Sequence, residues 1–521
     1  MVKFITAAQA AALIPDGAGV GVGGMGLSGW PEEIACALRD RYNATGHPKN
    51  LFLHQGCDIG DWAERGVSRL GETEPGMVTR WTCAHMGSAF AMHPHVKNGD
   101  IAAWMLPQGV IMNLWRAIGA GRPGVLTKVG LGTFVDPRCG GGRVNSAAKG
   151  SFAEVVSFGG EEYLFYKSYN VDVALLRGSV ADENGNITFD YESLIHEGYD
   201  IANAVHNSGG IVIVQVQYIA KSGTLSPQRV RIPAALVDYV VVATDPRACW
   251  QEEKTEFDPS ISGQQHKPMR KIPPAPLDER KVIARRCAME LRRGDLINLG
   301  VGIPSGVGRI LSEENCIGLV TTSAESGAIG GVTSYAPSAA FNSEAFIPHC
   351  DMFNLITGGG LDVTILGIGQ IDRFGNNNVH QFGGRITGCG GFIDITHATP
   401  RLVFCGTLTA KAKLAVHDGV LEILSEGSHR KFVRDVDSVT YAASRCAENQ
   451  EVLYVTERAV FKLTDGGLTM TEIAPGLDPE RDVLSAMDFR PAISPTLREM
   501  PSGIFREQWG ELRKYIDGIE E

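Results

Sequence analysis

The chain has 521 residues, which is more than one hydrophobic core usually holds, so we expect at least two domains. Hydrophobic residues make up 44% of the chain and charged residues 21%, as in ordinary globular proteins. A net charge of −11 without a Lys- or Arg-rich run argues against nucleic-acid binding, and no apolar run reaches the roughly 18 residues of a membrane span.

The start of the chain and its cysteines are typical of a cytoplasmic protein. The first residues do not combine a basic with an apolar stretch, so we expect no export signal. The 11 cysteines are scattered without a C-x-x-C pair, which predicts free thiols. Cys83, His85, His93 and His95 form a candidate metal cluster, but no second ligand pair has standard spacing, so we expect no metal site.

The N-terminal segment predicts a helix, a strand, a glycine loop and a second helix, at residues 7–13, 19–22, 23–26 and from 31. Gly21 to Gly26 match G-x-G-x-x-G after a strand, a pattern found in dinucleotide-binding proteins. The acid expected about 20 residues later should end a strand, whereas residues 39–41 are charged and look helical. Phosphate contact and a purely structural turn therefore both stay open for this loop.

One pattern recurs in the two halves of the chain. Each half has a helix, a strand, a glycine loop and a helix, and later an apolar strand before a D-x-x-G-N turn. The later strands are expected at residues 174–178, 210–216, 296–299, 364–368 and 401–405, and the two turns at Asp182 and Asp372. Strands alternating with helices predict two similar open α/β domains with mainly parallel sheets, and an active site in the cleft between them.

A polar, Pro-rich stretch between the two halves is typical of a linker. We place a first domain at residues 1–257, the linker at 258–276 and a second domain at 277–521. A helix over residues 278–293, capped by Asp278, should open the second domain. Residues 484–521 look irregular, with a terminal helix from about residue 504.

One carboxylate stands alone among small residues in the second half. Glu325 lies between Thr321 and Gly331, with no partner acid and no His or Cys at metal-ligand spacing. A covalent carboxylate nucleophile needs an ionised oxygen, little surrounding bulk and free backbone N–H groups. A glycine-rich turn with a solvated glutamate has the same composition, so both interpretations stay open for this segment alone.

A second glycine cluster, Gly388 to Phe392, surrounds Cys389. Such a loop can cradle a thioester or a phosphate. Cys389 with His380 or His397 as base would be an alternative nucleophile, although no local signature of a cysteine enzyme accompanies it.

Seven segments, spread over nearly the whole chain, carry a resemblance to a known family: residues 23–32, 128–138, 162–166, 298–304, 324–331, 388–395 and 472–476. Together they resemble the family I CoA-transferases, most closely the long, fused-chain acetate/propionate type. The A-E-S-G-A-I-G-G segment around Glu325 is the most specific part of the resemblance. The two-domain architecture of that family also accounts for the internal repeat.

The resemblance implies a covalent nucleophile at Glu325. It implies that CoA is a substrate and a covalent intermediate, with no tightly bound cofactor. Each step would pass through an oxyanion that backbone N–H groups stabilise. The implied oxyanion and acyl pocket consists of Met25, Gly26, Gln108, Gly390 and Gly391. The implied CoA contacts are Gly300, Val301, Gly302, Ile303, Pro304 and Asn378.

The implied function is CoA transfer between short-chain acyl-CoA and carboxylic acids such as acetate or propionate, by a ping-pong reaction through a glutamyl-CoA thioester. An acyl-CoA hydrolase on the same scaffold and a non-catalytic CoA- or nucleotide-sensing protein stay open as alternatives. The resemblance also implies a homo-oligomer, with a tetramer favoured.

Overall fold

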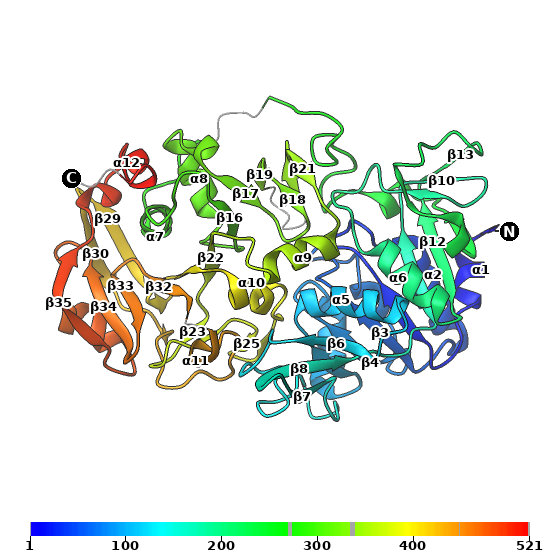
Figure 1. Ribbon diagram of the computed structural model, residues 1–521, viewed down its shortest axis with the longest axis horizontal. Coiled ribbons are helices and arrows are strands. Elements are labelled where there is room, and N and C mark those ends of the chain that lie inside the picture. The colour runs from blue at the N-terminus through cyan, green and yellow to red at the C-terminus, as the bar shows by residue number, and fades with distance from the viewer. Residues whose placement is uncertain (1, 269–272, 334–338, 447–448, 519–521) are drawn as a thin grey trace.

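Two large sheets built from separate parts of the chain organise the computed structural model, which describes residues 2–268, 273–333, 339–446 and 449–518 (Figure 1). The first sheet has the order β1-β15-β12-β9-β2-β3-β4-β5, and every neighbouring pair is parallel. Its strands are β1 (Lys3–Ile5), β2 (Gly19–Val22), β3 (Leu51–Gln55), β4 (Val78–Cys83), β5 (Ala102–Met105), β9 (Val173–Arg177), β12 (Ile211–Val216) and β15 (Tyr239–Val242).

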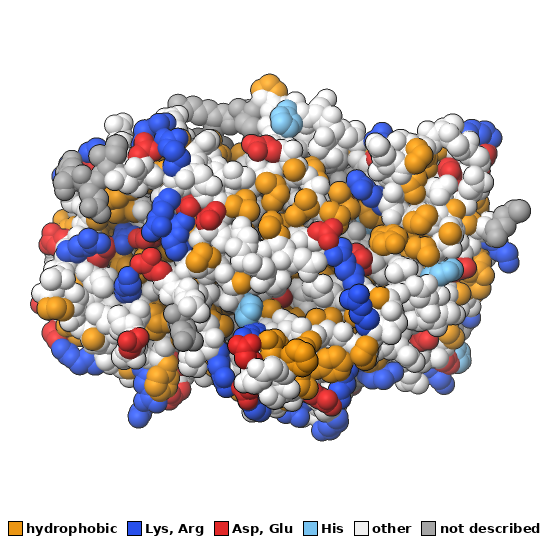
Figure 2. All heavy atoms as spheres, in the orientation of Figure 1, with side chains coloured by type: hydrophobic (Ala, Val, Ile, Leu, Met, Phe, Trp, Pro, Cys, Tyr) orange, Lys and Arg blue, Asp and Glu red, His pale blue; other side chains and the backbone are white. Residues whose placement is uncertain are grey.

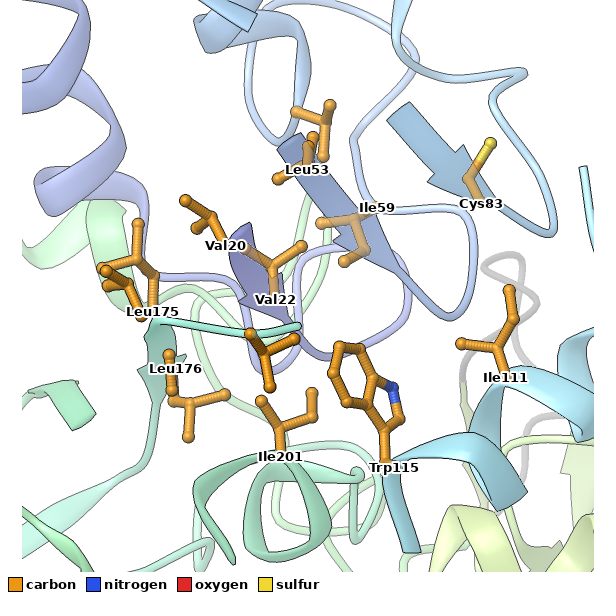
Figure 3. Packing of buried hydrophobic residues seen from close by; sticks show 14 of the residues in the cluster. Val20, Val22, Leu53, Ile59, Cys83, Ile111, Trp115, Leu175, Leu176 and Ile201 are labelled. Atoms are coloured by element: carbon orange, nitrogen blue, oxygen red, sulfur yellow. The ribbon is translucent and has the colours of Figure 1, made fainter. Parts of the chain in front are cut away.

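Helices cover the first sheet so closely that its central strands are buried completely, as in other parallel sheets. Trp115 and Ile201 point at β2, where a Cβ added to Gly21 would lie 3.1 Å from each side chain (Figure 3). A larger residue at Gly21 would therefore push these helices away. The helices of this half are α1 (Ala7–Ala12), α2 (Glu32–Thr45), α3 (Ser68–Gly71), α4 (His93–Asn98), α5 (Gln108–Gly119) and α6 (Gly198–Asn207).

Two smaller sheets extend the first half. The antiparallel sheet β6-β8-β7 carries the exposed side chains Leu126 and Phe158. A four-stranded sheet has the order β13-β10-β11-β14. The strands are β6 (Gly124–Thr127), β7 (Ala153–Phe158), β8 (Glu161–Lys167), β10 (Val180–Asp182), β11 (Ile187–Thr188), β13 (Tyr218–Ala220) and β14 (Val230–Ile232).

The second large sheet has the order β21-β18-β17-β16-β22-β27-β32-β33-β34-β35. Its central strands β17 to β32 are parallel, and antiparallel pairs occur toward both edges, so the predicted α/β fold with mainly parallel sheets is confirmed. Its strands are β16 (Leu296–Leu299), β17 (Thr321–Ser323), β18 (Ala328–Ile329), β21 (Ala345–Phe346), β22 (Val363–Gly367), β27 (Arg401–Cys405), β32 (Glu451–Val455), β33 (Ala459–Thr464), β34 (Gly467–Ile473) and β35 (Ala492–Glu499).

Within the described residues, the second half also contains short strands that form two-stranded sheets, and six α-helices. The helices are α7 (Glu279–Ala288), α8 (Gly306–Glu313), α9 (His349–Thr357), α10 (Phe392–Ala398), α11 (Ala443–Cys446) and α12 (Leu512–Ile516). The strands are β19 (Val332–Thr333), β20 (Ala340–Phe341), β23 (Gln370–Ile371), β24 (Asn377–Asn378), β25 (Gln381–Phe382), β26 (Arg385–Ile386), β28 (Thr409–Ala410), β29 (Lys413–His417), β30 (Val420–Ser425) and β31 (His429–Arg430).

The C-terminal tail differs from its prediction. Residues 492–499 form β35, which pairs in parallel with β34, and the helix expected from residue 504 is replaced by a 3₁₀ turn at Ser502–Phe505 and by α12. β35 is mostly exposed, so its sequence lacks the apolar alternation that identifies a half-buried strand.

The structure reproduces the predicted repeat down to single hydrogen bonds. Strand β2 lies between β9 and β3, and β16 lies between β22 and β17 in the same way. The Asp182 carboxylate accepts hydrogen bonds from the N–H groups of Asn184 and Asn186, at 3.0 and 2.9 Å. Asp372 repeats this turn with the N–H groups of residues 374 and 376, at 2.9 and 3.0 Å. Two similar α/β units are therefore present.

Helix α5 of the first half packs against α9 and α10 of the second half. Met112 on α5 belongs to the hydrophobic cluster of the second half, where its carbonyl accepts from the Cys350 thiol at 3.7 Å. Arg116, one turn further on, bonds both Asp200 (3.1 Å) and Asp351 (2.7 Å). The two halves therefore share a packed and hydrogen-bonded contact.

The expected linker is not a free tether in its first part. Ile261 is buried, and the Ser260 carbonyl accepts from Asn342 N–H at 2.9 Å. Residues 269–272 lie outside the described part of the chain. The first large sheet ends at Val242 and the second begins at Leu296, so we keep the division at residues 257 and 277 as a proposal.

The surface mixes charges of both signs. Figure 2 shows acidic and basic side chains interspersed over one face of the molecule. Within the described residues, no helix has the length and apolar character needed to cross a membrane.

Candidate active site

Glu325 sits in the tight turn that joins β17 to β18. Ala324 N–H donates to Ala328 O and Gly327 N–H to Ala324 O, both at 2.9 Å. Gly327 adopts φ +103°, and a Cβ there would collide with the Ile347 carbonyl, so the turn requires glycine. The flanking small residues thus hold the glutamate in a closed turn, next to the boundary between the two halves.

Gly391, the N-cap of α10, lies directly against the nucleophile candidate. A Cβ added to Gly391 would collide with Glu325 Oε2, and it would lie 3.0 Å from the Phe353 ring. The N–H of Gly391 has no hydrogen-bond partner among the residues that the structure describes. This glycine therefore leaves room for a carboxylate, and its donor is available.

Gln108, at the start of α5, joins the same group from the first half. Its backbone N–H donates to Gly390 O at 3.2 Å, while Gly390 N–H donates to Ala84 O at 2.9 Å. Its Oε1 lies 3.7 Å from the place that a Cβ on Gly390 would take. The structure thus brings Gln108 and Gly390 together, next to Gly391 and its contact with Glu325.

Two further residues support Gln108 and were not identified from the sequence. The side-chain nitrogens Gln108 Nε2 and His349 Nε2 lie 3.0 Å apart, and His349 Nδ1 lies 3.0 Å from Glu197 Oε2. Glu197 Oε1 accepts from Gly24 N–H at 3.2 Å. Because a carboxylate only accepts, His349 Nδ1 donates to Glu197, and the other ring nitrogen faces the Gln108 amide. The chain Gly24–Glu197–His349–Gln108 crosses between the halves twice.

The resemblance places Met25 and Gly26 in the oxyanion and acyl pocket, but their backbone N–H groups already have hydrogen-bond partners. Met25 N–H donates to Ser28 O at 3.0 Å and Gly26 N–H to Asp58 O at 2.9 Å, so both amides have protein partners. The Met25 side chain is buried against Cys57. Burial and then the nearby Glu325 charge raise the pKa of Cys57, which places this small cluster in the electrostatic environment of Glu325.

The site holds Glu325 partly out of water. Burial raises the pKa of Glu325 above that of an ordinary glutamate, while His349 and His85 act in the opposite direction. His85 Nδ1 lies 3.1 Å from Asp58 Oδ2. Burial lowers the pKa of His85, but the Asp58 charge and hydrogen bond outweigh it and the net pKa is raised. A poorly solvated carboxylate is a stronger nucleophile than a fully hydrated one, and once ionised it needs no separate base.

A second carboxyl, Asp394, lies buried beside the site. Its Oδ2 accepts from Gly109 N–H at 3.0 Å, and its Oδ1 has no partner among the described residues. Burial, opposed by this hydrogen bond and reinforced by the Glu325 charge, raises the pKa of Asp394 to about 8. Asp394 is therefore mainly protonated at neutral pH.

This raised pKa predicts a pH-dependent stability difference. Between about pH 4 and 8 the folded state holds a proton on Asp394 that the unfolded state has lost, so this residue makes folding less favourable as pH rises. The measured quantity is the apparent Tm of Asp394→Asn minus the apparent Tm of the wild type. We expect this difference to increase by several degrees between pH 5 and pH 8.5. Differential scanning calorimetry checks this, with Asp418→Asn as an exposed control. A pH-independent difference would mean that Asp394 is ionised throughout.

The loop expected to contact CoA follows the parallel strand β16. Gly300 N–H donates to Ile365 O at 2.9 Å, and Val301 next to it is 77% exposed, which is unusual for an aliphatic side chain. Asn378 is buried in β24, with its Nδ2 donating to Gln370 Oε1 (2.8 Å) and Gln381 O (3.0 Å). Within the described residues, no hydrogen bond or ion pair joins Glu325 to the loop from Gly300 to Pro304, which includes Gly302 and Ile303, or to Asn378.

The structure does not support Cys389 as an alternative nucleophile, because Cys389 and His380 interact with other residues. Cys389 is buried, its thiol donates to the Ala84 and Leu106 carbonyls at 3.6 Å, and burial raises its pKa well above the ordinary value. His380 stacks on Phe134, and burial lowers its pKa to about 3. No hydrogen bond from either histidine candidate reaches Cys389 in the described part of the chain.

Two of the candidate metal residues, His93 and His95, lie within hydrogen-bond distance of backbone carbonyl groups. His93 Nε2 lies 2.8 Å from Met86 O, and His95 Nε2 lies 3.1 Å from Gly71 O. Across the ranges that the structure covers, no three His, Cys, Asp or Glu side chains form a group able to hold a metal ion.

Comparisons with known proteins agree with this architecture. Residues 4–243 match the family model of coenzyme A transferase. The chain is 55% identical over 520 residues to caffeate CoA-transferase of Acetobacterium woodii, covering 98% of this chain and 99% of that protein. It is 40% identical over 510 residues to acetate CoA-transferase YdiF of Escherichia coli K12, covering 97% and 95% of the two chains.

The fold has a close counterpart among solved structures. The acyl-CoA transferase YdiF apoenzyme of Escherichia coli O157:H7 superposes with a TM-score of 0.92 at 39% identity, covering 98% of this chain and 97% of that one. The chain therefore belongs to the coenzyme A transferase family. It is a fused-chain family I member, and a transferase.

Proposed function

We propose that this protein transfers CoA from an acyl-CoA to a carboxylic acid, with Glu325 as the covalent nucleophile. The observation that carries this proposal is the position of Glu325, in a closed turn against Gly391 with Gln108 opposite. A structure of the Escherichia coli O157:H7 acyl-CoA transferase is described as a thioester complex with CoA. That description supports a thioester intermediate in a relative that is 38% identical.

The reaction proceeds in two symmetrical halves. The Glu325 carboxylate attacks the acyl-CoA carbonyl, which gives an acyl-glutamyl anhydride and CoA thiolate. The thiolate then attacks the glutamyl carbonyl, which gives a glutamyl-CoA thioester and releases the first acid. A second carboxylate reverses both steps and leaves as its CoA ester. Each tetrahedral oxyanion needs a donor, and Gly391 N–H is our candidate, with the Gln108 side chain near the acyl group.

The remote parts of CoA supply binding energy for this chemistry. We propose that the loop from Gly300 to Pro304 contacts CoA, because its exposed Val301 offers apolar surface to a pantetheine chain. Asn378 is the second proposed CoA contact, through its unpartnered buried Oδ1. CoA is thus a substrate that becomes covalently bound, and no other cofactor is needed.

The acyl donor in this proposal is a short-chain acyl-CoA such as acetyl-CoA or propionyl-CoA. The relatives are named for two different acids, acetate and caffeate. A short-chain donor is compatible with either acceptor, because the donor acid leaves before the acceptor binds. Location in the cytoplasm and assembly into a homo-oligomer, with a tetramer favoured, stay predictions of the sequence.

Mass spectrometry of the intact protein tests the proposal directly. After mixing with acetyl-CoA, we expect a CoA adduct that peptide mapping locates on Glu325 and that added acetate removes within the mixing time. Removal by water at the same rate would favour acyl-CoA hydrolysis instead. If no adduct forms with acetyl-CoA or propionyl-CoA, the covalent mechanism is wrong, and a CoA-sensing role becomes the better interpretation.

A further inference from the structure

A recess of about 310 Å³ opens at the boundary between the two halves, beside the active site. Trp62, Met86 and Phe90 of the first half line one side of the recess. Ile386, in the β25–β26 hairpin of the second half, lines the other side. Met86 N–H donates to Thr387 O at 2.8 Å, so a hydrogen bond joins the two walls. The recess therefore has the same two-sided construction as the site around Glu325.

The walls of the recess are aromatic and exposed. Trp62 is 50% exposed and Phe90 is 45% exposed, and their rings meet edge to face at 6.0 Å and 65°. Large aromatic side chains are usually buried, so two of them around one hollow indicate a site for an apolar or aromatic group. The edge-to-face arrangement leaves ring surface available for stacking against a third ring.

His85 lies between the recess and the residues around Glu325. His85, which directly precedes Met86, has its ring centroid 6.4 Å from that of Trp62. On its other side, His85 Cδ2 lies 4.0 Å from the place that a Cβ on Gly390 would take, and its charge acts on Glu325. A group that fills the recess can thus be joined by a short chain to a carboxylate at Glu325.

Two cations stand at the rim. Lys97 and Arg385 both line the recess and are exposed, and neither has an ion pair or side-chain hydrogen bond within the described residues. Ammonium and guanidinium groups donate to hydroxyl oxygens and also sit favourably over aromatic faces. The rim therefore suits a ring that carries polar substituents.

We propose that this recess binds the aromatic ring of the acceptor acid, so that the enzyme uses an arylacrylate or arylalkanoate carboxylate as a CoA acceptor. This inference rests on the proposed function, because it concerns the substrate of the same site. The volume suits one substituted ring, since it lies at the small end of ligand sites, and it is too small for a complete nucleotide with phosphates. The name of the Acetobacterium woodii relative, caffeate CoA-transferase, agrees with this class of acid.

The test compares two acceptors with acetyl-CoA as the donor. The measured quantity is kcat/KM for caffeate divided by kcat/KM for acetate. We expect Phe90→Ala and Trp62→Ala each to lower this ratio by roughly tenfold or more, because removing apolar packing that only the aromatic substrate uses changes specificity by about that factor. Phe158→Ala, which removes a 68% exposed ring from β7, is the matched control and should leave the ratio unchanged.

Ring substituents provide a second readout. Arg385→Met and Lys97→Met should lower the preference for caffeate over cinnamate, which lacks the hydroxyl groups. An unchanged caffeate-to-acetate ratio in both aromatic variants would overturn the inference. So would a rise in KM for acetyl-CoA with no change in the ratio, because the recess would then hold part of CoA.

The wild-type protein separates this inference from the proposed function. If acetate discharges the CoA adduct but neither caffeate nor cinnamate does, the aromatic site is wrong and the transferase mechanism stands. If acetyl-CoA forms no adduct on Glu325, the proposed function itself has failed.

Discussion

Glu325→Gln should lower the rate of CoA exchange by about four orders of magnitude or more, because removal of a covalent nucleophile leaves only the uncatalysed route. The amide has nearly the shape of the carboxylate, so it should fit the turn between β17 and β18 and still face Gly391. It cannot form the acyl anhydride, and the CoA adduct should disappear together with the activity. Exchange of labelled acetate into acetyl-CoA measures the rate.

Glu344→Gln is the matched control for this change. Glu344 lies on the same segment of the second half, is exposed, and its side chain packs near Gly330 rather than Gly391. It should keep the exchange rate of the wild type. Exchange by Glu325→Gln at more than a few per cent of the wild-type rate, after the absence of deamidation is checked by mass spectrometry, would remove Glu325 from the mechanism.

Gly391→Ala should reduce kcat by roughly a hundredfold or more, because a misplacement of about 1 Å at a reacting atom can cost that much. The residue adopts φ −81°, a conformation that alanine accepts, so the change tests space rather than backbone strain. The new methyl group would occupy the position of Glu325 Oε2 and press on the Phe353 ring. The carboxylate must then rotate away from Gly391.

Gly318→Ala controls for the general effect of adding a methyl group. A Cβ at Gly318 meets no atom within 4 Å, so this variant should keep its activity and Tm. The rate of CoA-adduct formation in a rapid-quench experiment isolates the first half-reaction. A normal rate in Gly391→Ala with an unchanged Tm would mean that Glu325 reacts from a different rotamer.

The sequence predicted those parts of the fold that local patterns determine. Strands β2 and β16 have the predicted bounds, and the Asp182 and Asp372 turns form because aspartate bonds the backbone two residues on. Asp278 caps α7 through Lys281 N–H, although the helix ends at Ala288 rather than at residue 293. The exposed edge strand β35 carries no apolar alternation and was missed.

The candidate site was predictable only in part. Glu325 and Gly391 lie in family-specific segments, so the sequence could indicate them. Glu197, His349 and Asp394 lie at or near the starts of helices far apart in the chain, without a motif, and only tertiary packing brings them together. The hydrogen-bond partner of the Met25 N–H could not be predicted either, because a glycine-rich sequence does not show which N–H groups already donate to the protein's own carbonyls.

The hydrogen-bonded chain from Glu197 through His349 to Gln108 limits how this protein can evolve. Its partners are 152 and 241 residues apart in sequence, yet each buried group depends on the next. A substitution on one half is therefore tolerated only with a matching one on the other. Recombination between distant relatives at the middle of the chain would preserve both sheets while separating side chains that hydrogen-bond across the two halves.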